Sequence, residues 1–176
     1  MTGKSKTRLE TSAVYWEPKI KTYGFQGYTG LSLLEVTVAA ERLSRITSLL
    51  ENPDYGGIRF YLVLLQAHED FTTRLIIVFD RKWEDRVLGF FEAAILPEKG
   101  ETIVLRSPVE VIYFFGPHFG DRYGIAETTF QVLAESDIRI VAAGFSGSAV
   151  YLVLPENSME RTKAVFNRTF EVPKNK

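Results

Sequence analysis

Residues 109–155 read VEVIYFFGPHFGDRYGIAETTFQVLAESDIRIVAAGFSGSAVYLVLP, and the fold is predicted most directly from this segment. Its opening apolar run, 109–115, predicts a β-strand, and the glycine-rich segment 116–121 that follows predicts a loop. Apolar residues then recur with helical spacing over 123–135. The stretch therefore begins as strand, glycine loop and helix.

Two more apolar runs complete this stretch. Residues 138–145 and 149–154 predict strands, and the serines and glycine at 146–148 form the tight turn between them. The predicted order is strand, loop, helix, strand, strand. The loop contains more glycine and aromatic residues than a plain connection needs.

The stretch resembles the ACT domain, a small regulatory module that senses amino acids, and in particular the version found in aspartate kinase. The resemblance covers about a third of the chain. Besides the glycine loop, it rests on short matching segments: Gly124, Ile125 and Ala126; Leu133 and Ala134; Ile138, Arg139 and Ile140; Phe145, Ser146, Gly147 and Ser148; and 150–155.

The composition is that of a folded protein without a strong charge. The chain has 176 residues, a formal net charge of −1 and no cysteine. Near-neutral charge argues against general attraction to nucleic acid or to an acidic membrane, and the lack of cysteine excludes disulfides and thiol catalysis. No apolar run approaches the roughly 20 residues of a membrane helix, and the start lacks the apolar core of a secretory signal. We expect a cytoplasmic protein.

Residues 32–107 are interpreted as a first copy of the same order, preceded by an N-terminal extension, 1–31, whose role is left open. Strands are predicted at 33–38, 58–66, 74–79 and 102–106. Two helices are expected between them, the second capped by Asp80. Their inward faces carry Leu43, Ile46, Leu49 and Leu50 in the first helix, and Trp83, Val87, Phe90 and Phe91 in the second.

Residues 108–176 are interpreted as the second copy. Asn157 and Glu160 are a plausible capping box for its second helix, and 169–172 is predicted to be a short closing strand. The fold class is therefore α+β, with two ferredoxin-like βαββαβ (ACT) repeats whose antiparallel sheets carry helices on one face.

The predicted strands are apolar on both sides, which a two-layer fold does not explain. In the run 58–66, for example, Phe60, Leu62 and Leu64 alternate with Tyr61, Val63 and Leu65. Such sheets need a second cover, because exposed apolar patches of that size are rare on monomers. The two repeats pairing with each other, or two chains forming a homodimer, would provide it.

The glycine loop is the candidate ligand site. A helix N-terminus offers unpaired N–H groups and the positive end of a dipole to the carboxylate of a free amino acid, and Asp121 can accept from its ammonium. The resemblance implies an effector held between this loop and the second strand of a partner domain. The residues concerned are Gly116, Pro117, His118, Phe119, Gly120, Asp121, Arg122, Tyr123, Gly124, Ile125 and Ala126 on one side, and Arg139, Ile140 and Val141 on the other.

Structural roles for the same residues stay open. Asp121 occupies a position suited to a helix N-cap, and the glycines suit turns. Arg139 stands where asparagine is common in aspartate kinase, and its positive charge disfavours a basic effector. The first repeat lacks a glycine loop, so its pocket is expected to be lost, and its second strand, 58–66, is expected to contribute to the site of the second repeat.

The leading hypothesis is a non-catalytic regulatory protein that binds a small molecule, foremost an amino acid, and acts on a separate regulated enzyme. The alternative is a structural or interaction module with an empty ligand site. Catalysis is not expected, because the chain has no cysteine, only His68 and His118, and no recognisable nucleophile with its base. No metal or cofactor is expected. Nucleic-acid binding is disfavoured by the charge and by the absence of a basic-aromatic strand.

Overall fold

The computed structural model describes residues 19–42, 44, 46, 57–68, 71–95 and 100–172. Its centre is one antiparallel sheet of six strands in the order β2-β3-β1-β4-β6-β5. The strands are β1 (Phe25–Ala39), β2 (Phe60–Ala67), β3 (Thr72–Asp80), β4 (Thr102–Phe115), β5 (Ala142–Phe145) and β6 (Ala149–Pro155). The helices are α2 (Glu84–Ala94), α3 (Ile125–Glu135) and α4 (Met159–Thr169), with short 3-10 turns η1 (Ala40–Arg42) and η3 (Arg81–Trp83). The class is α+β, as predicted.

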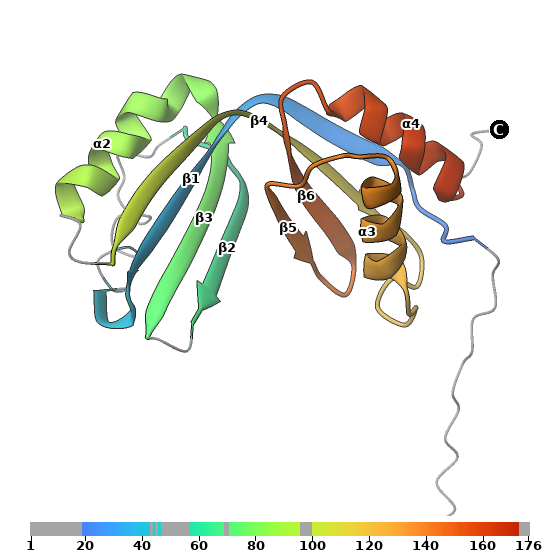
Figure 1. The fold of residues 1–176 in the computed structure, drawn as a ribbon, viewed down its shortest axis with the longest axis horizontal. Coiled ribbons are helices and arrows are strands. Elements are labelled where there is room, and N and C mark those ends of the chain that lie inside the picture. Colours follow the sequence, from blue (N-terminus) through green and yellow to red (C-terminus); the bar gives the residue numbers. More distant parts are fainter. Residues whose placement is uncertain are drawn as a thin grey trace, which may run out of the picture.

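The sheet bends into two halves that share β1 and β4 (Figure 1). In the first half, β3 and the start of β4 pair with β1 from Leu31 onward; in the second, Phe25 and its neighbours pair with the end of β4. The β1–β4 register shifts on either side of Leu31, which marks the bend. Helix α2 lies outside one half, and α3 and α4 lie outside the other.

The helix-covered faces form two separate cores. In the first half, Phe79 and Phe91 are fully buried and Ile46 is nearly so. In the second half, Phe114 and Phe166 lie in a core that also includes Phe119, Ile125 and Phe170. Leu43, Leu49 and Leu50, which carry most of the predicted face of the first helix, lie outside the described residues.

A third core occupies the helix-free side of the sheet, in the bend between the halves. It contains Leu31, Leu33, Val78, Val111 and Val153, each at most 2% exposed. The halves also touch away from the bend, because a Cβ built on Gly144 of β5 would lie 3.2 Å from Cδ2 of Leu64 on β2. One half therefore supplies part of the second cover that the apolar strands require.

The prediction of a closing strand at 169–172 is wrong. Helix α4 continues to Thr169, and Glu171 forms only an isolated bridge with Lys21. The place beside β4 is taken by the first residues of β1, Phe25 to Tyr28. The reason is length: at about 3.3 Å per residue, the 15 residues of β1 span roughly 50 Å and reach both halves.

Two predicted helix caps are also wrong. Asp80 makes no cap hydrogen bond, and its Oδ1 instead accepts one from the Tyr61 hydroxyl at 3.0 Å. At α4 the N-cap is Ser158, whose side chain does not cap the helix. A buried carboxylate on β4, Glu110, accepts from that helix end instead, so a tertiary contact replaces the predicted box of Asn157 and Glu160.

Two element boundaries differ from the sequence prediction. Strand β5 begins at Ala142, four residues later than predicted, because the segment after α3 approaches the sheet only at Val141, whose N–H donates to the Val153 carbonyl at 2.8 Å. Helix α3 begins at Ile125 instead of Tyr123. No helix in the described part of the chain is long and apolar enough to cross a membrane.

Candidate functional site

The glycine loop follows β4 and begins with a close backbone contact. A Cβ on Gly116 would lie 2.2 Å from the Lys21 carbonyl oxygen and 2.5 Å from Cε1 of Phe119. Phe119 itself is only 6% exposed, and its ring meets Phe114 edge-on at 6.0 Å. Gly116 and Phe119 thus hold the loop against the core, and neither residue offers a large exposed surface to a ligand.

The rest of the loop turns sharply before α3. His118 and Gly124 have positive φ angles of 61° and 85°, and the Asp121 N–H donates to the His118 carbonyl at 3.0 Å. Gly124 is the N-cap of α3. The interpretation of Asp121 as the cap is therefore wrong, because the helix begins three residues further on than that role requires.

The surface at the start of α3 offers an acceptor, the Asp121 carboxylate, and donors, the first backbone N–H groups of the helix. His118, Gly120, Asp121 and Tyr123 are exposed, Pro117, Arg122 and Ala126 are half-buried, and Ile125 is buried. The first N–H groups of a helix have no intrahelical acceptor and so can bind a carboxylate. One carboxylate is already close, since Oε2 of Glu127 lies 4.0 Å from the place of a Cβ on Gly124.

The second group of predicted site residues, Arg139, Ile140 and Val141, lies just before β5. Val141 sits beside Val153, which pairs with Val111, whereas the loop begins after Phe115. Val111 and Phe115 are four residue steps apart along β4, a distance of about 13 Å. Within one chain, the structure therefore does not bring the loop together with Arg139, Ile140 and Val141. Arg139 is exposed, and its two neighbours are half-buried.

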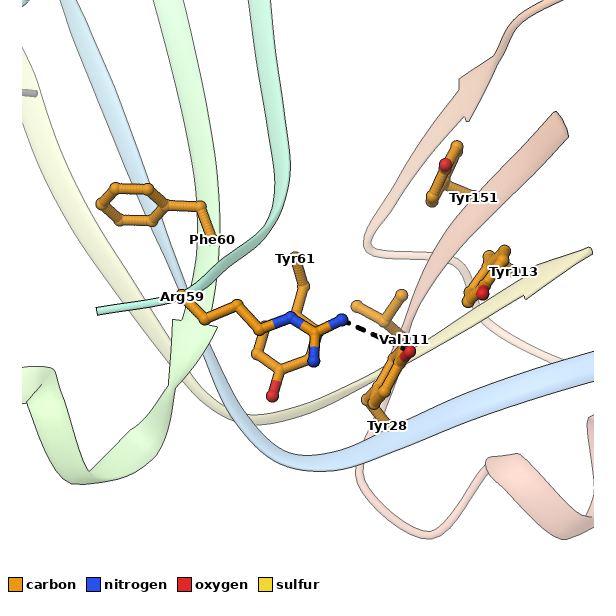
Figure 2. A pocket seen from close by; sticks show the side chains of 7 residues that line it. All are labelled: Tyr28, Arg59, Phe60, Tyr61, Val111, Tyr113 and Tyr151. Atoms are coloured by element: carbon orange, nitrogen blue, oxygen red, sulfur yellow. Dashed lines mark hydrogen bonds between the residues drawn. The ribbon is translucent and has the colours of Figure 1, made fainter. Parts of the chain in front are cut away.

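A pocket that the sequence did not reveal opens on the helix-free side between the halves (Figure 2). Its volume is about 190 Å³. We call it the tyrosine pocket, and its lining residues are Tyr28, Arg59, Phe60, Tyr61, Val111, Tyr113 and Tyr151. Arg59 and the first residues of β2 come from the first half. The other residues come from β1, β4 and β6, where these strands form the second half.

Strand register explains why the tyrosines meet. Tyr28 pairs with Val111, and Tyr113 pairs with Tyr151, so all four side chains point to the same face of the sheet. The rings of Tyr113 and Tyr151 stack with centroids 5.5 Å apart, and those of Tyr28 and Tyr113 lie 6.1 Å apart and nearly parallel. The sequence alone could have shown that Tyr113 lies on the same face of its strand as Val111. It could not have shown that Tyr28 and Tyr151 lie beside Tyr113.

The first half closes the pocket with an arginine and a tyrosine. The Arg59 guanidinium carbon lies 4.6 Å from the ring centroid of Tyr61 and 5.2 Å from that of Tyr28. Tyr61 and Tyr28 are themselves 4.7 Å apart. Partial burial, together with the hydrogen bond to Asp80 and its negative charge, raises the pKa of the Tyr61 phenol. The phenol therefore stays neutral at physiological pH.

Polar bonds fix two of the hydroxyl groups. Tyr61 donates to Asp80, and Tyr113 donates to Oε1 of Gln26 at 2.5 Å. Among the described residues, no group of three or more His, Cys, Asp or Glu side chains could hold a metal ion. The chemistry that this arrangement offers is stacking, hydrogen bonding and the binding of an anion.

Comparison with known proteins supports the fold. No protein-family model and no curated protein sequence matches the chain. Several solved structures do. The regulatory subunit of aspartate kinase from Thermus thermophilus is 12% identical, with a TM-score of 0.71 over 85% of this chain and 99% of that one.

Two longer chains, both aspartate kinases, show the same likeness. Aspartate kinase from Synechocystis is 16% identical, with a TM-score of 0.75 over 98% of this chain and 31% of that chain. Aspartokinase III of E. coli, solved in complex with lysine and aspartate, is 13% identical, with a TM-score of 0.58 over 89% of this chain and 35% of that one. At these identities the likeness shows a shared fold, that of the regulatory part of aspartate kinase.

Proposed function

We propose that this chain is a non-catalytic regulatory protein that binds a small molecule, foremost a free amino acid, and passes the signal to a separate enzyme. The observation that carries the proposal is the likeness to the Thermus thermophilus regulatory subunit, which extends over 99% of that chain. A chain built like a regulatory subunit acts by favouring one arrangement of an interface, and a ligand shifts that arrangement only if it binds one form more tightly.

The strand order supports two ACT-like units. The first, assigned to 32–107, has the order β2-β3-β1-β4, and the second, assigned to 108–176, has the order β1-β4-β6-β5. These orders are equivalent if the first residues of β1 act as the last strand of the second unit. The N-terminal extension 1–31 then has a structural role, because Phe25 to Tyr28 complete that unit.

We assign the amino-acid site to the loop and helix start, 116–126. Its carboxylate would meet the first N–H groups of α3, and its ammonium would meet Asp121. Arg139, Ile140 and Val141 lie about 13 Å from that loop along the strand, so they would reach it from the partner chain of a homodimer. A cation at Arg139 favours an effector with an acidic side chain over lysine, one of the two ligands named for the E. coli enzyme.

One feature favours the alternative, an interaction module without an effector. The Glu127 carboxylate already lies near Gly124 at the start of α3, where it would compete with the carboxylate of a ligand. In that case the two units would serve only to present a surface to another protein.

A thermal-shift screen of the full chain against the free amino acids distinguishes the regulatory protein from the interaction module. A ligand at a hundred times its Kd adds about 2.7 kcal/mol of stability. The regulatory function therefore predicts a rise of several degrees in the melting temperature with one compound. Asp121→Asn should abolish that rise while leaving the melting temperature of the free protein unchanged, and Glu127→Gln should enlarge it. The absence of a shift with every amino acid, in wild type and Glu127→Gln alike, would favour the interaction module.

A further inference from the structure

We propose that the tyrosine pocket is a second ligand site, separate from the glycine loop, and that it takes a planar aromatic ring carrying a carboxylate. The pocket lies on the helix-free side of the sheet between the two halves, whereas the loop lies beyond the end of β4. The proposal does not depend on amino-acid binding at the loop.

The size of the pocket selects a single ring. Its volume is about 190 Å³, and an engineered apolar cavity of about 150 Å³ in another protein is known to admit benzene. A six-membered ring with one carboxylate therefore fits. Figure 2 shows Arg59 and Tyr61 on one side of the pocket, opposite Tyr113 and Tyr151.

The walls suit an aromatic ring in particular. Tyr28, Tyr113 and Tyr151 present a series of near-parallel rings, and Val111, only 1% exposed, forms an apolar floor. Aromatic pairs in offset or edge-to-face geometry are stabilised beyond the simple burial of their area. A saturated ring of the same size lacks the quadrupole that this geometry uses.

Arg59 selects the charge. Its guanidinium stacks on Tyr28 and Tyr61, and its one hydrogen bond to the described residues is a long one, donated by Nη2 to the Tyr28 hydroxyl at 3.5 Å. In the described part of the chain no carboxylate forms an ion pair with it. Most of its five N–H donors therefore remain available, and their planar fork matches a carboxylate. A cationic ligand would be repelled.

The position of the pocket gives such a ligand a consequence. Arg59 and Tyr61 belong to the first half, whereas Tyr113 and Tyr151 belong to the second. The two halves are joined by the bent strands β1 and β4 and meet through the third core. A ligand that contacts both sides holds the halves at one relative angle. It would bind that angle more tightly than any other, which is the condition for shifting a conformational equilibrium.

The test is titration of the full-length protein with benzoate, followed by amide chemical shifts in ¹H–¹⁵N spectra. We expect a Kd on the order of 1 mM, as befits a ligand of this size. The shifts should concentrate at Tyr28, Arg59, Tyr61 and Tyr113 and spare 118–126. Benzamide, which keeps the ring without the charge, and cyclohexanecarboxylate, which keeps the charge without the planar ring, should each bind about tenfold more weakly.

Variants test the two recognition elements separately. Arg59→Gln should weaken benzoate binding about tenfold, and Tyr113→Leu should weaken it by a similar factor. Arg168→Gln, an exposed arginine at the end of α4, and Tyr23→Leu, a tyrosine 61% exposed outside the pocket, are the matched controls and should bind as wild type does. Unchanged affinity in Arg59→Gln, binding of either analogue as tight as that of benzoate, or shifts confined to the loop would each overturn the proposal. So would the absence of any shift at saturating benzoate.

Discussion

Glu110 on β4 accepts a hydrogen bond at its Oε2 from the backbone N–H of Met159, the first residue of α4, at 2.7 Å. The same oxygen accepts from the N–H of Ser158 at 3.0 Å. Glu110 is only 5% exposed, and a buried charge needs compensation. These two donors and the positive end of the helix dipole provide it. This one carboxylate ties α4 to the sheet.

Replacing Glu110 with alanine should lower the free energy of unfolding by about 2–3 kcal/mol, because two N–H groups at a buried helix end lose a charged acceptor. Urea unfolding of the purified variant measures the change. Glu160→Gln, on the same helix with its carboxylate 89% exposed, is the control and should stay within about 0.5 kcal/mol of wild type. Equal stability of the two variants would show that the cap contributes nothing.

Two glycines should respond to alanine in opposite directions. At Gly116 the new Cβ meets the Lys21 carbonyl and the Phe119 ring, so Gly116→Ala should destabilise the protein by about 1–3 kcal/mol. Gly89 lies within α2 with nothing within 4 Å of the added atom, so Gly89→Ala should stabilise it by about 0.5–1 kcal/mol. Thermal unfolding of both variants measures the two changes in stability. A loss of stability in Gly89→Ala would contradict the position of Gly89 inside a helix with open space around it.

The Glu84 carboxylate should make folding stability depend on pH. Partial burial alone would raise the pKa of Glu84, but hydrogen bonds from Ser107 and Ser32, with help from Arg81, outweigh this and hold the pKa below its ordinary 4.5. The Ser32 hydroxyl donates to Oε1 of Glu84 at 2.5 Å. A group whose pKa falls on folding stabilises the protein above its unfolded pKa, and that stability disappears as pH falls through the folded value.

The stability difference between wild type and Glu84→Gln should therefore be largest above about pH 5 and shrink as the pH is lowered. Chemical unfolding measured at a series of acidic pH values gives the comparison. Ser107→Ala, which keeps the carboxylate and removes one donor, should show an intermediate dependence. A difference that does not change with pH would mean that these hydrogen bonds leave the carboxylate unaffected.

Tyr61 should ionise at higher pH than an ordinary tyrosine. Its raised pKa owes part of its shift to Asp80, so Asp80→Asn should bring that pKa down toward 10. A group with a raised pKa stabilises the fold below its unfolded pKa and ceases to do so as pH rises through the folded value. Phenolate absorbance during alkaline titration measures the effect, and Tyr61→Phe identifies which component is lost. Identical titration curves for wild type and Asp80→Asn would refute the assignment.

Much of the fold follows from local pattern. The periods of the apolar residues predicted α3, β6 and β3, and the glycine loop was located correctly after β4. The apolar character of both strand faces also indicated a second cover, part of which the third core provides. Such features depend on residues a few positions apart, and their physical cause, side-chain periodicity matched to backbone geometry, is present in the sequence itself.

The predictions that were wrong concern partners far apart in the chain. The caps assigned to Asp80, Asp121 and Asn157 were each plausible from their neighbours. At α4, however, the acceptor comes from Glu110, 48 residues before Ser158, and no local pattern points to it. The separation of the loop from Arg139 is likewise a matter of strand register.

Local patterns in the chain were enough to predict the fold class, most of the elements and the glycine loop. The three-dimensional structure was needed to show that Phe25 to Tyr28 complete the second half of the sheet, and that Arg59 and Tyr61 meet Tyr113 and Tyr151 across its bend. Periodicity shows which face a side chain occupies, whereas pairing between distant strands depends on the packing energy of the whole chain, which no short segment contains.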